Sequence, residues 1–130
     1  MKKILTLCTV ILAFFALTAM RADNTAEFKF EKETHDFGKI SQGKPVSVDF
    51  NFTNIGEEPL IIADVVPTCG CTTKEFTKTP IKKGESGVIT LTFNAANIGS
   101  FSKGITVKSN AKTPVKVLYI KGEVVSANSN

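Results

Sequence analysis

The feature of this sequence that most constrains its fold is the strict alternation of apolar and polar residues along short segments. In residues 46–53 every even position is apolar and every odd position is polar. Residues 89–93 repeat the pattern with threonine on the polar side. A period of two residues is typical of a β-strand that buries one face and exposes the other to water. Each segment therefore predicts a half-buried strand.

A third apolar face is formed by Phe101, Ile105 and Val107, and Lys103 interrupts it. We expect that lysine to lie near the end of a strand or to extend outward to water. Residues 60–66 and 115–120 are apolar on both sides. Runs of this kind indicate central strands or strands that contain a bulge.

Weaker strand signals lie at residues 27–31, 36–40 and 72–76. Glycine, asparagine and proline, which favour turns, separate the strands at residues 41–45, 54–59, 82–85, 97–100 and 109–114. No segment after residue 22 shows a helical period. About seven short strands in about 100 residues predict an all-β fold, an immunoglobulin-like antiparallel β-sandwich. We place this single domain at residues 23–125 and a polar tail at residues 126–130.

The first 22 residues have the layout of a secretory signal peptide. A basic start is followed by an apolar run over residues 4–17 and by a segment of small residues. We expect cleavage after Ala19 or Ala22. The run is shorter than the about 20 apolar residues that a transmembrane helix needs. Cys8 lies inside the run and not just after it, so a lipid-modified cysteine is not expected. The protein is therefore expected to be exported, either periplasmic or associated with the cell surface.

Removal of residues 1–22 changes the charge of the chain. Lys2, Lys3 and Arg21 are lost, so 16 basic residues become 13 against an unchanged 12 acidic ones, and the net charge falls from +4 to +1. Nucleic acid and anionic membranes require clustered basic residues, and we expect neither as a partner. The remaining chain contains lysine but no arginine, which argues mildly against a receptor for phosphate or carboxylate groups.

Cys69 and Cys71 are the only cysteines after residue 22. In an oxidising compartment they are a candidate disulfide or redox pair. Gly70 permits the sharp bend that so small a loop requires, and a strained bridge of this kind is readily reduced. A structural staple, a redox-active dithiol and a Cu(I) site with two thiolate ligands all stay open. Zinc is disfavoured because it needs three or four protein ligands.

The other polar signals favour structural roles. His35 is the only histidine and has no nucleophile near it in the sequence, so we expect a hydrogen-bonded structural residue. Residues 51–53 match the glycosylation sequon, but they lie in an expected strand. The loop at residues 54–59 is either a solvated turn or a contact for a partner. We expect no catalytic residue, no metal site and no cofactor.

A series of motifs runs along the chain: His35-Asp36-Phe37-Gly38-x-Ile40, Phe50-x-Phe52-x-Asn54-x-Gly56-x-x-Pro59-Leu60-x-Ile62, Cys69-Gly70-Cys71-Thr72, Pro80-Ile81-x-x-Gly84, Gly99-x-Phe101-x-Lys103 and Ser109-Asn110. From about Phe28 to Val124 this series resembles the domain-of-unknown-function family numbered 1573, and Cys-Gly-Cys-Thr is its most specific part. The segment at residues 54–60 is also similar to immunoglobulin-like domains related to major sperm protein and to cilium-associated modules. Lys83 stands where the family often has proline.

The resemblance implies an exported bacterial protein with an immunoglobulin-like sandwich, and it implies no reaction. From the residues and the resemblance we expect a non-catalytic module that acts through protein–protein contacts with another envelope protein. An exposed strand edge is one means of such contact. The alternative is a periplasmic thiol-redox or Cu(I)-handling protein that uses Cys69 and Cys71.

Overall fold

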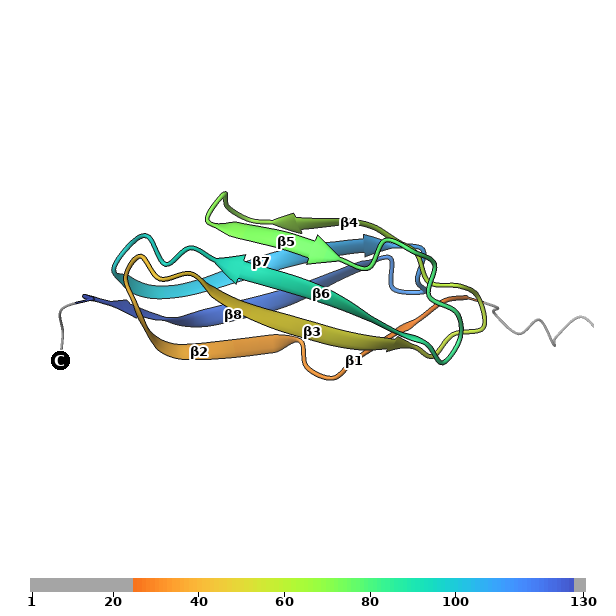
Figure 1. Cartoon of the computed structure of the whole chain (residues 1–130). Helices are drawn as coiled ribbons and strands as arrows, with labels where there is room; N and C mark the ends of the chain where they lie inside the picture. The colour runs from red at the N-terminus through yellow and green to blue at the C-terminus, as the bar shows by residue number, and fades with distance from the viewer. Residues whose placement is uncertain (1–24, 128–130) are drawn as a thin grey trace, which may run out of the picture.

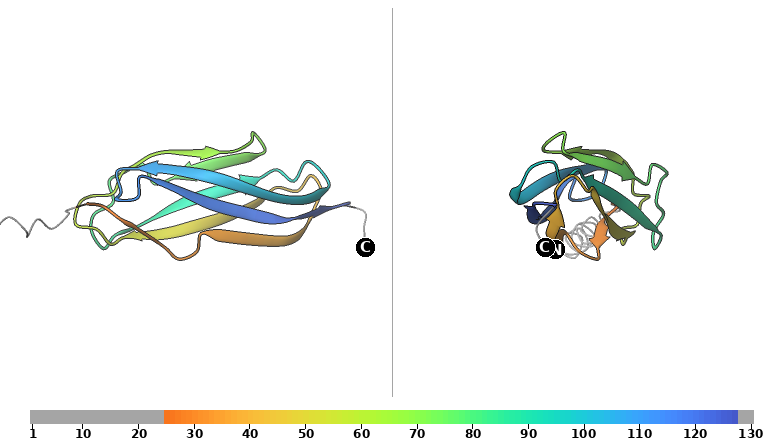
Figure 2. Two further views of the ribbon diagram at one scale, coloured as in Figure 1. Left: turned by 180° about the vertical axis from the view of Figure 1, so that it is seen from behind. Right: turned by 60° about the vertical axis from the view of Figure 1, so that its left-hand side comes forward.

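The protein is a two-layer sandwich of β-strands (Figure 1). The computed structural model describes residues 25–127, and this part of the chain contains no helix. Its strands are β1 (Phe28–Phe30), β2 (Thr34–Ser41), β3 (Val46–Asn54), β4 (Ile62–Pro67), β5 (Thr72–Phe76), β6 (Ser86–Phe93), β7 (Gly99–Ser109) and β8 (Val115–Val125). The first sheet has the order β1-β3-β6-β5 and the second the order β2-β8-β7-β4. The two sheets face each other along the long axis of the molecule (Figure 2).

The prediction of an all-β, immunoglobulin-like sandwich is confirmed, and two details differ. The described residues form eight strands, where about seven were expected, because each of the eight segments with a strand signal forms a strand of its own. β2 also runs parallel to β8, so the sandwich is not purely antiparallel. The parallel register shifts between Asp36 and Lys39, where Gly38 adopts a positive φ of 67°. A bulge at glycine is a common way to bend such an edge strand.

The strands that the alternation predicted form where it predicted them, as β3, β6 and β7, and the weaker signals form β1, β2 and β5. Residues 115–120 belong to β8, which is central in the second sheet. The segment at residues 60–66 gives the edge strand β4 from Ile62 onward, with a register shift between Ile62 and Asp64. Leu60 instead forms an isolated bridge with Ile81.

The core lies between the sheets and is built from alternate positions of the strands. Its largest fully buried apolar side chains are Phe50, Phe52, Leu60, Ile89, Leu91, Ile105, Leu118 and Ile120. The eight phenylalanines of the strands lie in this core or pack against it. Burial of one large apolar side chain stabilises a fold by about 1.5–3 kcal/mol. The described domain therefore holds its two layers together without tryptophan.

A buried asparagine holds the end of β3. Asn54 is fully buried, and its Oδ1 accepts hydrogen bonds from the backbone N–H groups of Glu27 (3.2 Å) and Gly56 (2.9 Å). Its Nδ2 donates to the carbonyl oxygens of Glu58 (2.7 Å) and Ile81 (2.9 Å). A buried polar group stabilises a fold only when its hydrogen bonds are satisfied. The loop at residues 54–59 is thus tied internally to the chain before β1 and before β6.

The expected signal peptide at residues 1–22 lies outside the described residues, as do the last three residues of the expected polar tail. Within residues 25–127, no helix has the length and apolar character needed to cross a membrane.

Candidate functional site

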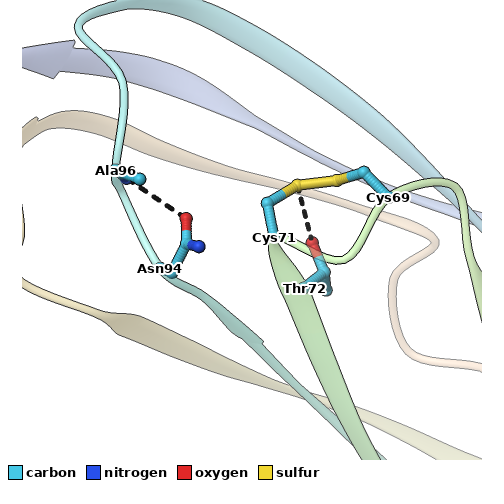
Figure 3. Close-up of a disulfide and its surroundings, with 5 residues drawn as sticks. All are labelled: Cys69, Cys71, Thr72, Asn94 and Ala96. Atoms are coloured by element: carbon cyan, nitrogen blue, oxygen red, sulfur yellow. Dashed lines mark hydrogen bonds between the residues drawn. A yellow bond between two sulfur atoms is a disulfide. The ribbon is translucent and has the colours of Figure 1, made fainter.

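Cys69 and Cys71 are joined by a disulfide in the turn between β4 and β5 (Figure 3). Their Cα atoms lie 5.3 Å apart, which is within the ordinary range for disulfides. β4 and β5 are edge strands of different sheets, and an ion pair between Lys74 and Asp64 (2.8 Å) also links them. The bridge therefore closes the turn in which the chain passes from the second sheet to the first. Redox or Cu(I) use of the pair stays a prediction.

The turn lies beside a hollow of about 130 Å³ at this end of the sandwich. Cys71 lines it together with the stacked rings of Phe93 and Phe101, whose centroids are 4.1 Å apart, and with Asn94 of the following loop. The Asn94 N–H donates a hydrogen bond to the Cys71 carbonyl oxygen (3.0 Å). Asn94 Oδ1 in turn accepts from the Ala96 N–H (3.1 Å), as drawn in Figure 3. The wall of the hollow next to Cys71 is thus held by backbone contacts.

Lys103 of β7 lines the same hollow. It lies opposite the fully buried Ile120 of β8, so its side chain starts on the core side of the second sheet. The residue is half-buried. Within residues 25–127, its ammonium group makes no ion pair or hydrogen bond. The cation of Lys103 is therefore available to a negative charge that forms in the hollow.

Thr72 completes the surroundings of the bridge. It is 5% exposed, and its Oγ1 lies 3.9 Å from Cys71 Sγ, within hydrogen-bond range for sulfur (Figure 3). Gly70, between the two cysteines, is exposed, and a side chain added there would meet no atom within 4 Å. The cysteine pair is therefore supported on the Cys71 side and open on the side of Gly70.

The outer face of the second sheet carries a second candidate site. Val115, Val117 and Tyr119 alternate with buried residues along β8 and are exposed, Tyr119 by 46%. Val66 of β4 and Thr106 of β7 lie in the same cross-strand row as Val117. The ring of Tyr119 lies over Gly104, because a Cβ added at that glycine would be 3.5 Å from the ring. Val66 of β4 and the three exposed residues of β8 lie on either side of Thr106 and Gly104 of β7. We call this group of four apolar residues the apolar face.

The outer face of the first sheet is the opposite in character. Its central strands present hydroxyl and carboxyl groups that bond to one another across the strands. The pairs are Ser47–Thr92 (2.7 Å), Thr90–Asp49 (2.7 Å) and Thr53–Ser86 (3.2 Å). Cross-strand pairs of this kind stabilise a sheet and leave a hydrated surface. Among the described residues, the outer side of the first sheet is therefore mainly polar, with the half-buried Val88 opposite Asn51.

His35 is hydrogen-bonded and packed. Lys32 Nζ lies 2.9 Å from His35 Nδ1, and the edge of the imidazole meets the Phe37 ring at a centroid distance of 4.6 Å. Burial, and then the nearby Lys32 ammonium, lower the pKa of His35 from 6.5, while the Asp36 carboxylate opposes the shift. The Lys74 ammonium and the Val65 N–H likewise lower the pKa of Asp64 from 3.8. Within residues 25–127, no three His, Cys, Asp or Glu side chains gather as a metal site.

Sequence reasoning singled out the cysteines but missed the apolar face. Residues 115–120 are apolar on both sides, and this pattern correctly predicts a central strand but does not say which of its faces is covered. The structure buries one face of β8 and exposes Val115, Val117 and Tyr119. The sequence did contain a signal for this surface. A strand that is apolar on both sides needs a covering layer or a partner to protect its second side from water.

The sequence matches a family described as "Protein of unknown function (DUF1573)" over residues 28–124. The chain belongs to this family. No curated protein matches the sequence significantly. The family match covers both the Asn54 turn and the cysteine turn, so both are parts of the DUF1573 domain and not additions to it.

Solved structures with the same fold have low sequence identity. One is a protein of unknown function from Porphyromonas gingivalis W83, with a TM-score of 0.68 and 20% identity over 82% of this chain. The present chain spans 50% of that protein. The human CEP192 ASH/PapD-like domain 7 has a TM-score of 0.64 and 12% identity, with 85% of this chain and 93% of that one covered. The YadV chaperone has a TM-score of 0.54 and 13% identity, with 80% and 55% covered. These likenesses establish the fold of the DUF1573 domain alone.

Proposed function

We propose that this DUF1573 protein is an exported, non-catalytic module that binds another envelope protein through the apolar face of its second sheet. The observation that carries the proposal is the exposed group Val66, Val117 and Tyr119, which lies on β4 and β8 on either side of β7. Single exposed apolar residues are ordinary, whereas a contiguous group on one face is typical of an interaction site. The expected signal peptide supports export to the periplasm or the cell surface.

Contact through the face is favoured over addition of a strand at an edge. Each edge strand has a feature that disfavours a new neighbour. β1 is three residues long, and β2 and β4 have register shifts. β4 ends at Pro67, and Lys74 places a charge on the same side of β5 as the buried Thr72. Docking on the flat apolar face needs none of these edges.

The test compares the two outer faces. Tyr119→Lys and Val117→Lys place a charge on the apolar face, and Asn51→Lys places the same charge on the outer face of the first sheet, where Asn51 is exposed. Purified mature protein is crosslinked to an extract of its native envelope, and far-UV circular dichroism checks the fold. We expect both apolar-face variants to lose one specific crosslinked partner that Asn51→Lys retains. Retention of that partner by all three variants would contradict the proposal.

The second candidate function is thiol redox or Cu(I) handling by Cys69 and Cys71. It is favoured by the position of the pair, which borders a hollow that Lys103 also lines. The two candidates are separated by a thiol count on native and denatured protein, with and without reductant and Cu(I). Thiols that are released under native conditions, or one-to-one copper binding, support the second candidate. A bridge that opens only after unfolding supports a purely structural pair.

A further inference from the structure

We infer that Cys69–Cys71 is a site of thiol–disulfide exchange, attacked at Cys69, in which Lys103 stabilises the thiolate that leaves at Cys71. This inference rests on the second candidate function and not on the apolar face. The inference makes the second candidate more specific. It names Cys69 as the sulfur that is attacked, Cys71 as the sulfur that leaves, and Lys103 as the residue whose charge stabilises the leaving thiolate. The substrate class is a dithiol, either a small molecule or a pair of protein cysteines.

The two sulfurs have different surroundings, and this difference sets the direction of attack. Cys71 borders the hollow that Lys103 also lines, and its Sγ lies 3.9 Å from the Thr72 hydroxyl. A cation and a hydroxyl donor both favour a thiolate over a thiol. Cys69 has only the exposed residues Thr68 and Gly70 beside it in the chain. In disulfide exchange, the sulfur whose thiolate is more stable is the faster leaving group. Cys71 therefore leaves, and the attack is on the sulfur of Cys69.

Lys103 is suited to this role because no carboxylate among the described residues neutralises its charge. A half-buried lysine is normally paired with a carboxylate or extended fully to water. Lys103 starts on the core side of β7, opposite Ile120, and within the described residues its ammonium has no ion-pair or hydrogen-bond partner. A cation in a partly enclosed hollow acts more strongly on a nearby charge than one at an open surface. A thiolate at Cys71 is the negative charge that the hollow can supply.

The exchange balances as follows. A thiolate of the incoming dithiol attacks Cys69 Sγ and forms a mixed disulfide, while the Cys69–Cys71 bond breaks and its electron pair leaves on Cys71 Sγ. The second thiol of the substrate loses its proton to water and attacks the substrate sulfur of the mixed disulfide. This step releases Cys69 as a thiolate and the substrate as a disulfide. Two electrons pass from the dithiol, which is oxidised, to the cysteine pair, which is reduced.

The approach to Cys69 is from the side of Gly70. Apart from its two chain neighbours, no atom lies within 4 Å of the position that a side chain on Gly70 would occupy. Thr68 and Gly70 are exposed, and Cys69 is half-buried, so we place the incoming substrate thiol on this side of the turn. Attack on Cys71 would have to enter past the wall formed by Phe93, Asn94 and Phe101. Access and leaving-group stability point to the same sulfur.

The first experiment measures the rate at which dithiothreitol reduces the disulfide of the folded mature protein near neutral pH. We expect Lys103→Met to slow reduction about tenfold and Lys103→Arg to restore most of the rate, because the effect depends on the charge of the neighbouring group. Lys121→Met is the matched control, since it removes a cation from the exposed outer side of β8. It should leave the rate unchanged. High salt should slow the native protein and not Lys103→Met.

The second experiment locates the attacked sulfur. The oxidised protein is treated briefly with glutathione, quenched with acid, and mapped by mass spectrometry. We expect glutathione on Cys69 and a free thiol on Cys71. Glutathione mainly on Cys71, or a Lys103→Met rate equal to that of Lys121→Met, would overturn the inference and leave a redox role for the pair intact. A disulfide that dithiothreitol cannot reduce without unfolding would overturn both that role and the inference.

Discussion

The two most distinctive turns of the molecule lie at opposite ends of the sandwich and have opposite environments. Asn54 ends β3, whereas Thr72, directly after the cysteines, begins β5 in line with Val46 at the start of β3. Figure 1 shows the β4–β5 turn and the end of β3 at the two ends of the long axis. Asn54 is fully buried and both polar atoms of its amide are hydrogen-bonded, although most of the loop that follows it is exposed. The cysteine turn is partly exposed and borders a cation without a partner among the described residues.

The difference separates the two motifs by role. The Asn54 turn serves the fold, and the cysteine turn is the one for which we propose a reaction. A motif whose donors and acceptors all bond within the chain has nothing left to offer a ligand. The cysteine pair lies in a partly exposed turn, with Cys71 packed against the core, and the exchange that we propose for it requires such exposure. Substitutions at the two ends should therefore differ in kind. Those at the Asn54 end should change the free energy of unfolding, and those at the cysteine end should change reactivity.

The largest effect is expected from Asn54→Ala. The substitution leaves the N–H groups of Glu27 and Gly56 and the carbonyl oxygen of Glu58 without the amide that they bond to. The Ile81 carbonyl oxygen loses its buried bond to Asn54 and keeps the one from the Leu60 N–H. Each buried group left unsatisfied costs about 1–3 kcal/mol, so we expect a loss of at least about 3 kcal/mol in the free energy of unfolding. The measurement is urea unfolding followed by far-UV circular dichroism.

Asn94→Ala is the control at the other end of the molecule. Asn94 is exposed and its side chain accepts one hydrogen bond, from the Ala96 N–H. A loss of about 1 kcal/mol or less is expected for a single exposed bond. Equal losses in the two alanine variants would remove the distinction between the two ends.

A smaller effect is expected from glycine substitutions, one in each turn. A Cβ at Gly56 would lie 2.1 Å from the Thr25 carbonyl oxygen and 2.6 Å from Ala26 Cα. The chain before β1 must then shift, and we expect Gly56→Ala to cost about 2 kcal/mol, as overpacking commonly does. Gly70→Ala meets no atom within 4 Å, so its cost should stay within about 0.5 kcal/mol. Thermal unfolding of both variants measures the contrast, which fails if Gly70→Ala is the less stable.

The sequence predicts those features of the two ends that depend on contacts between residues close together in the chain. The strands follow from a local period of two, and the pattern around Phe50 and Ile89 places them correctly. The parallel pairing of β2 depends on where the chain crosses between sheets, which no local pattern near Thr34 records. Lys103 was seen to break an apolar face, but its place beside Cys71 requires β7 and the β4–β5 turn to meet. Both the pairing of β2 and the position of Lys103 thus depend on contacts between segments that are distant in the sequence, which a local pattern does not predict.

A smaller loss again is expected when the bridge is removed. The Cys69–Cys71 bridge closes a loop with a sequence separation of two residues, and so short a loop restricts the unfolded chain little. We expect the double variant Cys69→Ser, Cys71→Ser to lose about 1–2 kcal/mol in the free energy of unfolding. Reductant should lower the stability of the native chain by a similar amount and leave the double variant unchanged. A loss above about 3 kcal/mol would instead make the bridge a principal support of the fold.

The smallest effect concerns pH and comes from the cysteine half of the molecule. The pKa of His35 is lowered from 6.5 in the folded state, so the unfolded chain takes up the proton first as the pH falls. The stabilisation is complete above about pH 6.5 and is lost as the pH falls through the lower folded value.

The lowered pKa of Asp64 adds a second loss below its ordinary value of 3.8, because protonation ends its ion pair with Lys74. His35→Gln should flatten the first part of the stability profile and Asp64→Asn the second. Asn54→Ala should lower the whole profile and keep its slope, because it removes hydrogen bonds and no titrating group. A change of slope in Asn54→Ala would show that the two ends are coupled.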